Sequence, residues 1–336
     1  MLKRLQMINK LSRVTAYIET YAFDQRNGEM VKRAHATGFF VKTKNKVLLV
    51  TNWHVVTGLN PANPSSMLGK CIPEVLKVTV ISKSGTLTEL TFPLYDRELQ
   101  PLWDEHHERN LVDMIVYPVP SMLEEQFYLF DILSEVDGSK INQSIGSDVF
   151  ILGYPFSKES MQEGFGEDNH YYLPVWKRGS IATEPELRIN GKLILIDTMS
   201  RPGMSGSPVV ICEEQDVMRA LTDKGEDIVK RLHNGDALAA LEITPSDIVN
   251  EKKKTFNVLG IYSGVIGSTR LQELALGKCW HIDTLVELVK SPAAGLMPHH
   301  EPLELHKHYE RFLNNILGVM ITRDTEGNEI SRVTLK

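Results

Sequence analysis

The chain of 336 residues has only three cysteines, Cys71, Cys212 and Cys279, which are far apart and include no C-x-x-C pair. This argues against a disulfide framework and against a zinc site, so a reducing, cytoplasmic location is expected. No apolar run reaches membrane-spanning length, and the basic residues 1–10 lack the unbroken apolar core of a signal peptide. No association with a membrane is therefore expected.

The chain also lacks an excess of positive charge. It has 37 lysines and arginines against 43 acidic residues, which gives a net charge of -6. This balance argues against a nucleic-acid partner. Charged residues (24%) and apolar residues (42%) are typical of a soluble globular protein, and the length suits one large or two small domains.

A glycine-rich loop at residues 197–210 lies between two β-type apolar runs, residues 193–196 and 209–211. Gly203 and Gly206 flank Ser205 and allow a sharp turn that leaves the amides of Gly203 and Ser205 pointing at one spot. Two such amides would form an oxyanion hole, and Ser205 would be the nucleophile. The alternative is a structural turn, because glycine and serine are common turn residues.

A base and a group that orients it are present elsewhere in the chain. His54 follows a predicted β-hairpin made of residues 36–41 and 47–51. It is either a hydrogen-bonded structural residue or the base that Ser205 requires. Asp113 is the one acid in an apolar strand predicted at residues 111–118. A buried carboxylate needs a partner, and the ring N–H of a histidine would serve.

Short strands separated by turn signals occur before and after residue 140, and they predict two small β-barrels rather than βαβ units. The cluster of histidines and acids within residues 103–109 is interpreted as a solvated loop. Its potential ligands are adjacent in the chain rather than spaced to converge, so no metal site is expected.

Residues 213–254 change in character and include two helix-like stretches, 216–232 and 237–249. We interpret them as an insertion that covers the active site or binds a partner, or else as an outward decoration that only adds stability. A helix is predicted at residues 280–289. A second helix at 305–317 and a terminal hairpin at 319–322 and 330–334 follow it.

The chain order His54, Asp113, Ser205 resembles that of the chymotrypsin-like (trypsin-like) serine proteases, and most closely their disulfide-free bacterial-type branch. The resemblance is carried by residues 51–56, 112–116 and 203–209 and covers about residues 30–290. It implies an all-β core of two six-stranded antiparallel β-barrels with a helical insertion and an α/β C-terminal extension. The implied organisation begins with an N-terminal lead at residues 1–30 and a first barrel at residues 31–139, which contains His54 and Asp113. A second barrel at residues 140–290 contains Ser205 and the insertion at 213–254, and a C-terminal extension follows at residues 291–336.

The resemblance also implies the roles of the site residues. His54 would be the general base, Asp113 would fix its tautomer, and Ser205 would form an acyl-enzyme. The amides of Gly203 and Ser205 would hold the oxyanion, and no metal or organic cofactor would be needed. The expected function is therefore that of a serine endopeptidase acting on protein or peptide substrates.

Substrate binding is expected to involve Met199, Tyr262, Ser263 and Gly264. Trypsin-like proteases have an acid where Met199 stands, so an apolar or small P1 residue is expected. Residues 262–264 would pair with the substrate backbone. Met204 replaces the acid with which secreted zymogens of the family are activated, so activation by that ion pair is not expected.

Two other functions were weighed. A catalytically inactive protease fold used as a binding or scaffold module is the alternative, although the complete set of three residues disfavours it. An α/β-hydrolase esterase is excluded, because its elbow motif needs a glycine where Ser207 stands and its serine comes first in the chain. A regulatory partner would bind residues 213–254 or 291–336, and a narrow-specificity processing protease would suit a cytoplasmic location.

Overall fold

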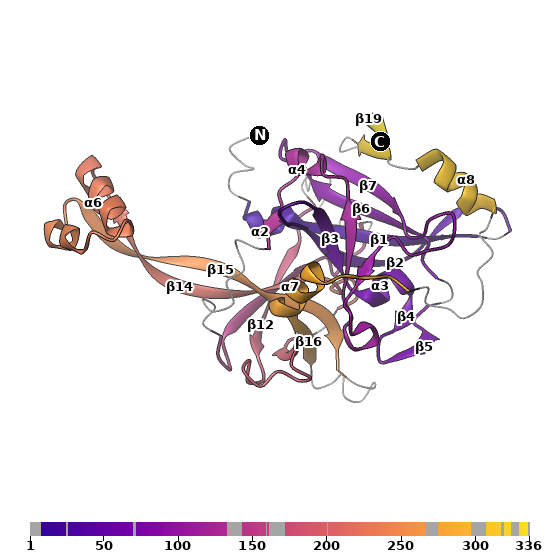
Figure 1. Cartoon of the computed structure of the whole chain (residues 1–336), viewed down its shortest axis with the longest axis horizontal. Helices are drawn as coiled ribbons and strands as arrows, with labels where there is room; N and C mark the ends of the chain where they lie inside the picture. The colour runs from indigo at the N-terminus through magenta and orange to yellow at the C-terminus, as the bar shows by residue number, and fades with distance from the viewer. Residues whose placement is uncertain are drawn as a thin grey trace. The chain divides into compact units, whose positions relative to one another are not determined.

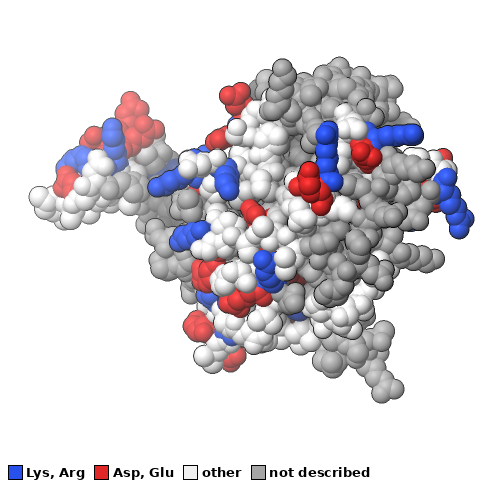
Figure 2. Space-filling view, turned by 45° about the vertical axis from the view of Figure 1, so that its right-hand side comes forward, with Lys and Arg blue, Asp and Glu red and all other residues white. Residues whose placement is uncertain are grey.

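The chain forms two compact units, Met1–Ile211 with Val258–Lys336, and Cys212–Asn257. The larger unit is mostly β structure, as the sequence predicts. None of the described helices has the length and apolar content needed to cross a bilayer. Acidic and basic side chains are interspersed on the face shown in Figure 2. The computed structural model describes residues 8–24, 26–69, 72–132, 143–158, 160, 172–199, 201–266, 275–296, 307–316, 319–323 and 329–334.

The first half of the chain and three strands near its C-terminus build an 11-stranded sheet (Figure 1). In hydrogen-bonded order its strands are β17, β8, β9, β3, β2, β1, β6, β7, β18 and β19, with β10 beside β2. The bounds are β1 Thr15–Phe23, β2 Met30–Lys42, β3 Val47–Thr51, β6 Val75–Ile81, β7 Leu87–Pro93, β8 Asp104–Glu105, β9 Ile115–Val119, β10 Phe130–Asp131, β17 Ala293–Ala294, β18 Val319–Arg323 and β19 Glu329–Thr334. The hairpin predicted at residues 36–51 is confirmed, since β2 pairs with β3. A closed first barrel is not confirmed.

The strand β1 was missed in the sequence, where residues 1–30 read as a lead. It lies inside the sheet, between β2 and β6. Its buried Glu19 obscures the apolar pattern, because an acid in a core strand is tolerated only when it is paired. Here Glu19 forms an ion pair with Lys32 at 2.5 Å and accepts hydrogen bonds from the hydroxyls of Tyr17 and Tyr21.

The predicted C-terminal helix and hairpin are present as α8 (Lys307–Ile316), β18 and β19. They join the first sheet, because β18 pairs with β7. The hydroxyl of Tyr309 on α8 donates to the carbonyl of Tyr95 at 2.7 Å and accepts from its amide at 2.9 Å. Tyr309 and Phe312 also pack against the ring of Phe23. The helix α8 is therefore part of the hydrophobic core beside the 11-stranded sheet.

The second half of the larger unit is a closed six-stranded barrel, as predicted. Its core contains apolar side chains from every strand, including Ile151, Ile196 and Leu259. The loop that carries Ser205 connects two of these strands, β13 and β14. In order around the barrel the strands are β11 Asp148–Gly153, β12 Val175–Ile181, β13 Leu193–Asp197, β16 Leu276–His281, β15 Ile248–Val265 and β14 Pro208–Ala220.

The smaller unit consists of the outer ends of β14 and β15 with α6 (Asp223–His233) and the 3-10 helix η3 (Ala237–Glu242). The helical prediction for residues 216–232 and 237–249 is thus partly wrong, because both outer ends are strands. The helix starts late because Thr222 caps it, accepting from the amide of Gly225 and donating to Asp247. The small core of this unit is formed by Ile228, Ala239 and Ile248.

Short elements complete the larger unit. The loop predicted at residues 60–75 contains a two-stranded sheet made of β4 (Leu59–Asn60) and β5 (Asn63–Met67). The helix predicted at residues 280–289 is confirmed as α7, although Trp280 and His281 belong to β16. The remaining helices are α2 Lys10–Val14, α3 Trp53–Thr57, η1 Arg109–Leu111, α4 Leu123–Gln126 and α7 Ile282–Lys290.

Candidate active site

The structure brings His54, Asp113 and Ser205 together. His54 lies in α3, which begins directly after β3. Its Nδ1 is 2.7 Å from Oδ2 of Asp113, and its Nε2 is 3.0 Å from Oγ of Ser205. The backbone N–H of His54 donates to the other carboxylate oxygen of Asp113 at 2.9 Å. Both oxygens of the acid therefore hold the histidine, which fixes the imidazole between the acid and the hydroxyl.

Asp113 is buried, with 3% of its surface exposed. It precedes β9 instead of lying on a strand, so the predicted strand at residues 111–118 is too long at its start. Its backbone carbonyl accepts from Nδ2 of the buried Asn52 at 2.8 Å, and its Oδ2 accepts from the hydroxyl of Ser263 at 2.5 Å. These contacts hold the carboxylate in one orientation.

Burial opposes ionisation of Asp113, but its pKa is nevertheless lowered. The charge of the nearby His54, and hydrogen bonds from His54 and Ser263, outweigh the loss of hydration. The carboxylate is therefore anionic and accepts the proton on Nδ1 of His54. In the neutral form of His54 that keeps this proton on Nδ1, Nε2 has a lone pair and can accept the proton of Ser205.

The loop around Ser205 is shaped by two glycines with left-handed backbone conformations, Gly203 (φ +88°) and Gly206 (φ +83°). Only glycine adopts these conformations without strain. The amide of Gly206 donates to the carbonyl of Tyr262 at 3.0 Å, which ties the loop to β15. Among the described residues, no group accepts a hydrogen bond from the amide of Gly203 or of Ser205. Both amides are thus available to a negatively charged oxygen.

Thr37 is a positioning residue that the sequence analysis missed. Its amide donates to the carbonyl of Ser205 at 2.8 Å, and its hydroxyl donates to the carbonyl of Gly203 at the same distance. The hydroxyl also accepts from the amide of Tyr154. Thr37 and Gly203 are 166 residues apart, so no local sequence pattern could have connected them.

The four residues predicted to bind substrate lie in different environments. Met199 is 62% exposed, so it does not form the buried floor of a pocket. Tyr262 is buried and supports the loop through its carbonyl. The hydroxyl of Ser263 contacts Asp113, which sequence reasoning did not predict. Gly264 has a φ of +81°, and a Cβ atom there would meet nothing within 4 Å, so the space beside it is open.

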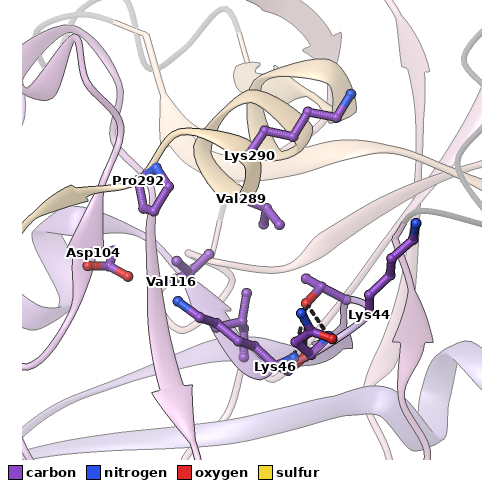
Figure 3. A pocket seen from close by; sticks show the side chains of 10 residues that line it. Lys44, Lys46, Asp104, Val116, Val289, Lys290 and Pro292 are labelled. Carbon is purple, nitrogen blue, oxygen red and sulfur yellow. Dashed lines mark hydrogen bonds between the residues drawn. The ribbon is translucent and has the colours of Figure 1, made fainter.

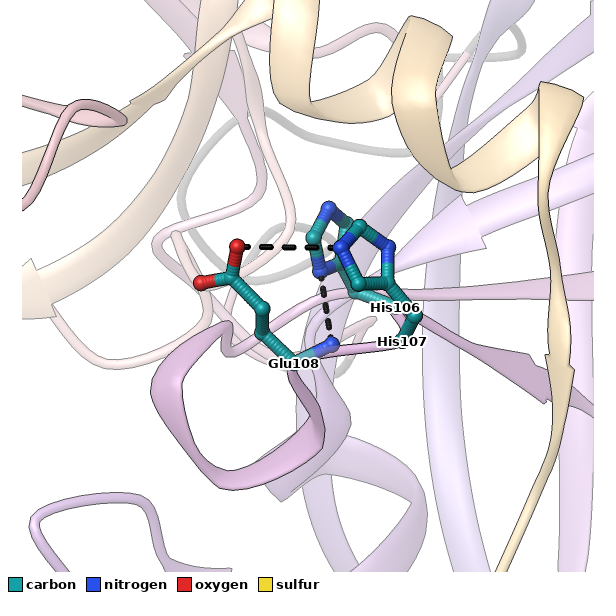
Figure 4. Close-up of side chains that lie close together, drawn as sticks. All are labelled: His106, His107 and Glu108. Carbon is teal, nitrogen blue, oxygen red and sulfur yellow. Dashed lines mark hydrogen bonds and ion pairs between the residues drawn. The ribbon is translucent and has the colours of Figure 1, made fainter.

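His106, His107 and Glu108 form a second cluster, with potential ligand atoms within 4.8 Å of one another (Figure 4). The prediction of a solvated loop is wrong for His106, which is fully buried. Its Nε2 contacts Glu287 at 3.2 Å, and its Nδ1 accepts from the amide of Glu108 at 3.1 Å. The carboxylate of Glu108 pairs with Lys192 at 2.8 Å. A metal ion would have to replace these contacts, so the cluster fits a structural role better.

Comparison with known protein families identifies the family to which the chain belongs. A family model described as a trypsin-like peptidase domain matches residues 36–217, which is more than half of the chain. The match includes His54, Asp113 and Ser205 and ends within β14, before β15 begins. A comparison with curated proteins found no match. With a trypsin-like domain over most of its length, a closed six-stranded barrel and a protease-type arrangement of side chains, the chain belongs to the trypsin-like peptidase family.

Proposed function

We propose that the protein is a serine endopeptidase that cleaves peptide bonds through His54, Asp113 and Ser205. The observation that carries the proposal is the continuous chain of contacts from Asp113 to Nδ1 of His54, and from Nε2 to Oγ of Ser205, at 2.7 and 3.0 Å. This is the hydrogen-bonded arrangement of nucleophile, base and orienting acid that acyl transfer requires.

In the proposed reaction His54 removes the proton from Ser205 as Oγ attacks the carbonyl carbon of the substrate. The carbonyl oxygen becomes negatively charged and accepts hydrogen bonds from the amides of Gly203 and Ser205. The C–N bond then breaks, and His54 passes its proton to the departing amine. Water attacks the acyl-enzyme in the second half-reaction, again deprotonated by His54, and releases the acid and the free Ser205 hydroxyl.

For specificity, we propose an apolar or small P1 side chain. The supporting observation is that Met199, six residues before Ser205, presents exposed apolar surface and no charge. A peptide library cleaved by the wild-type protein, but not by the Ser205→Ala variant, would define the P1 preference. Enrichment of arginine or lysine at P1 would contradict this expectation.

The test of activity is labelling with a fluorophosphonate probe, which reacts only with an activated serine. We expect the wild-type protein to be labelled and Ser205→Ala to remain unlabelled. Ser207→Ala is a matched control on the same loop, because Ser207 is fully buried and, among the described residues, it is Ser205 and not Ser207 that forms a hydrogen bond with His54. A folded wild-type protein that fails to react would favour the inactive scaffold instead.

The regulatory role of residues 213–254 is also a proposal. The helix η3 exposes Leu238 (70%) and Leu241 (84%), and such exposed apolar side chains suit a protein partner. Replacement of residues 213–254 by a short linker should change turnover or substrate range. Unchanged turnover and substrate range would contradict a regulatory role and would indicate that the segment only adds stability. The free thiols of Cys212 and Cys279 support our proposal of a reducing, cytoplasmic location.

A further inference from the structure

A pocket of about 230 Å³ lies on the larger unit, outside the candidate active site (Figure 3). Its floor is apolar and includes Leu48 of β3, Val116 of β9 and Val289 of α7. Its volume is below the roughly 300–1,000 Å³ of pockets that hold drug-sized ligands. The space therefore suits one large apolar side chain rather than a whole metabolite.

Three lysines surround this apolar floor: Lys44, Lys46 and Lys290. Within the described part of the chain, no carboxylate lies in ion-pair contact with any of them, whereas Lys42 of the same hairpin pairs with Glu124. One carboxylate, Asp104, also lines the pocket. In Figure 3 it lies on the opposite side of the view from Lys44 and Lys290, whereas Lys46 extends towards it and the charges of Lys46 and Asp104 interact. Three cations against one anion give the pocket a positive character in a chain whose net charge is -6.

The walls of the pocket are held by hydrogen bonds, so its shape is built into the fold. The turn that carries Lys44 and Lys46 is closed by the amide of Thr43, which donates to the carbonyl of Lys46 at 2.9 Å. The hydroxyl of Thr43 accepts from the amide of Lys46 at 3.1 Å. On the other side, β17 follows Pro292 and pairs with β8, which contains Asp104.

We propose that this pocket is a docking site for an acidic peptide segment of a partner protein, which inserts one large apolar side chain between the three lysines. Charge complementarity carries the choice of occupant: carboxylates on either side of the apolar residue would meet the ammonium groups of Lys44, Lys46 and Lys290. Two strands contribute to this floor, β3 and β9. The chain continues from β3 into His54, and β9 starts after Asp113. The bound segment would thus contact the elements that support both residues.

The test measures binding without catalysis, so its outcome does not depend on the proposed protease activity. The probe is a fluorescein-labelled, end-capped peptide with one phenylalanine between two pairs of glutamates, and the protein is the full chain with Ser205→Ala. We expect saturable binding by fluorescence anisotropy that weakens as salt is added. A peptide with serine in place of phenylalanine should bind roughly tenfold more weakly.

Two variants locate the site. Lys44→Glu with Lys46→Glu should weaken binding by roughly tenfold or more. Val289→Trp, which fills the pocket without changing charge, should weaken the phenylalanine peptide but not the serine peptide. The matched control is Lys230→Glu with Lys254→Glu, which makes the same change in net charge at exposed positions of the smaller unit.

Three results would overturn the proposal. One is the absence of saturable binding up to about 1 mM protein, because the dissociation constant would then exceed about 1 mM. Another is equal loss of binding in the control variant, which would show attraction to net charge alone. The third is equal affinity for the phenylalanine and serine peptides, which would identify a general polyanion site.

Discussion

Ser263 donates a hydrogen bond to Oδ2 of Asp113, the same carboxylate oxygen that contacts Nδ1 of His54. The two residues are 150 positions apart. Ser263 belongs to β15 of the closed barrel, whereas Asp113 precedes β9 of the first sheet. This bond therefore connects the two β structures at the acid that orients the histidine.

Replacement of Ser263 by alanine should lower kcat/KM about tenfold to hundredfold, because a hydrogen bond to a charged group contributes about 1.5–3 kcal/mol.

The same replacement should change the acid unfolding of the protein. The pKa of Asp113 is lowered in the folded protein, so the stabilisation that the ionised Asp113 provides is present above the pKa of this residue in the unfolded chain and is lost as the pH falls. Without Ser263 the pKa of Asp113 in the folded protein should be lowered less, so that loss should be smaller and should be complete at a higher pH. Acid unfolding followed by circular dichroism measures the shift, with Ser180→Ala as the control. Identical acid transitions in the two variants would contradict this role.

Gly206 is expected to be intolerant of any side chain. A Cβ atom there would lie 2.0 Å from the carbonyl oxygen of Thr37, in addition to the strain of its positive φ. Gly146 is the matched control, because it has a φ of +79° but nothing within 4 Å of its Cβ position. Gly146→Ala should cost about 1–2 kcal/mol of unfolding free energy. Gly206→Ala should cost about 1–3 kcal/mol more, since the overlap is with backbone. Urea denaturation measures both, and equal costs would refute the expected clash.

His281 should make stability depend on pH. Burial first, and then the charge of Arg188, lower the pKa of His281 to about 4. As the pH falls below about 6.5, His281 binds a proton in the unfolded chain but stays neutral in the folded protein. The free energy of unfolding should therefore decrease as the pH falls from about 6.5 towards 4. The loss from this group is on the order of 3 kcal/mol.

The variant His281→Asn tests this pH dependence. Asparagine keeps an acceptor for the amide of Asp283, which His281 caps at the start of α7. Asparagine does not titrate in this range, so the unfolding free energy of the variant should fall less than that of the wild type between pH 7 and pH 4. Carboxylates titrate in both proteins and cancel in the difference. Parallel pH profiles would rule out His281 as the source.

Zinc should not stabilise the protein through His106, His107 and Glu108, because His106 and Glu108 already hold other partners. A site with a Kd of about 1 μM would add about 2.7 kcal/mol at about 100 μM zinc. We expect no such increase in a thermal melt, and no change after addition of a chelator. A zinc-dependent rise that disappears in His107→Ala would show that the cluster binds metal.

Local patterns predicted much of the β structure. The hairpin of β2 and β3 and most strands of the closed barrel were visible as short β-prone runs between turn signals, but β16 was not predicted, and its residues 280 and 281 were assigned to a helix. Local sequence patterns gave wrong predictions where strand pairing in the folded protein outweighed the local preference of the residues. Glu19 concealed β1, and the polar outer ends of β14 and β15 were predicted to be helical. The exposure of Met199 could not be predicted from the sequence either, because the exposure of a side chain depends on which residues pack over it in the folded protein.

The sequence alone determined which residues could perform the chemistry. The glycines around Ser205, the position of His54 after a hairpin and the lone acid Asp113 identified all three side chains, because each residue type and its local backbone are encoded nearby. Only the tertiary structure decided how they are supported. Thr37 reaches the Ser205 loop and Ser263 reaches Asp113 across long stretches of chain. Such contacts arise when strands close in space, and no pattern within a single segment records them.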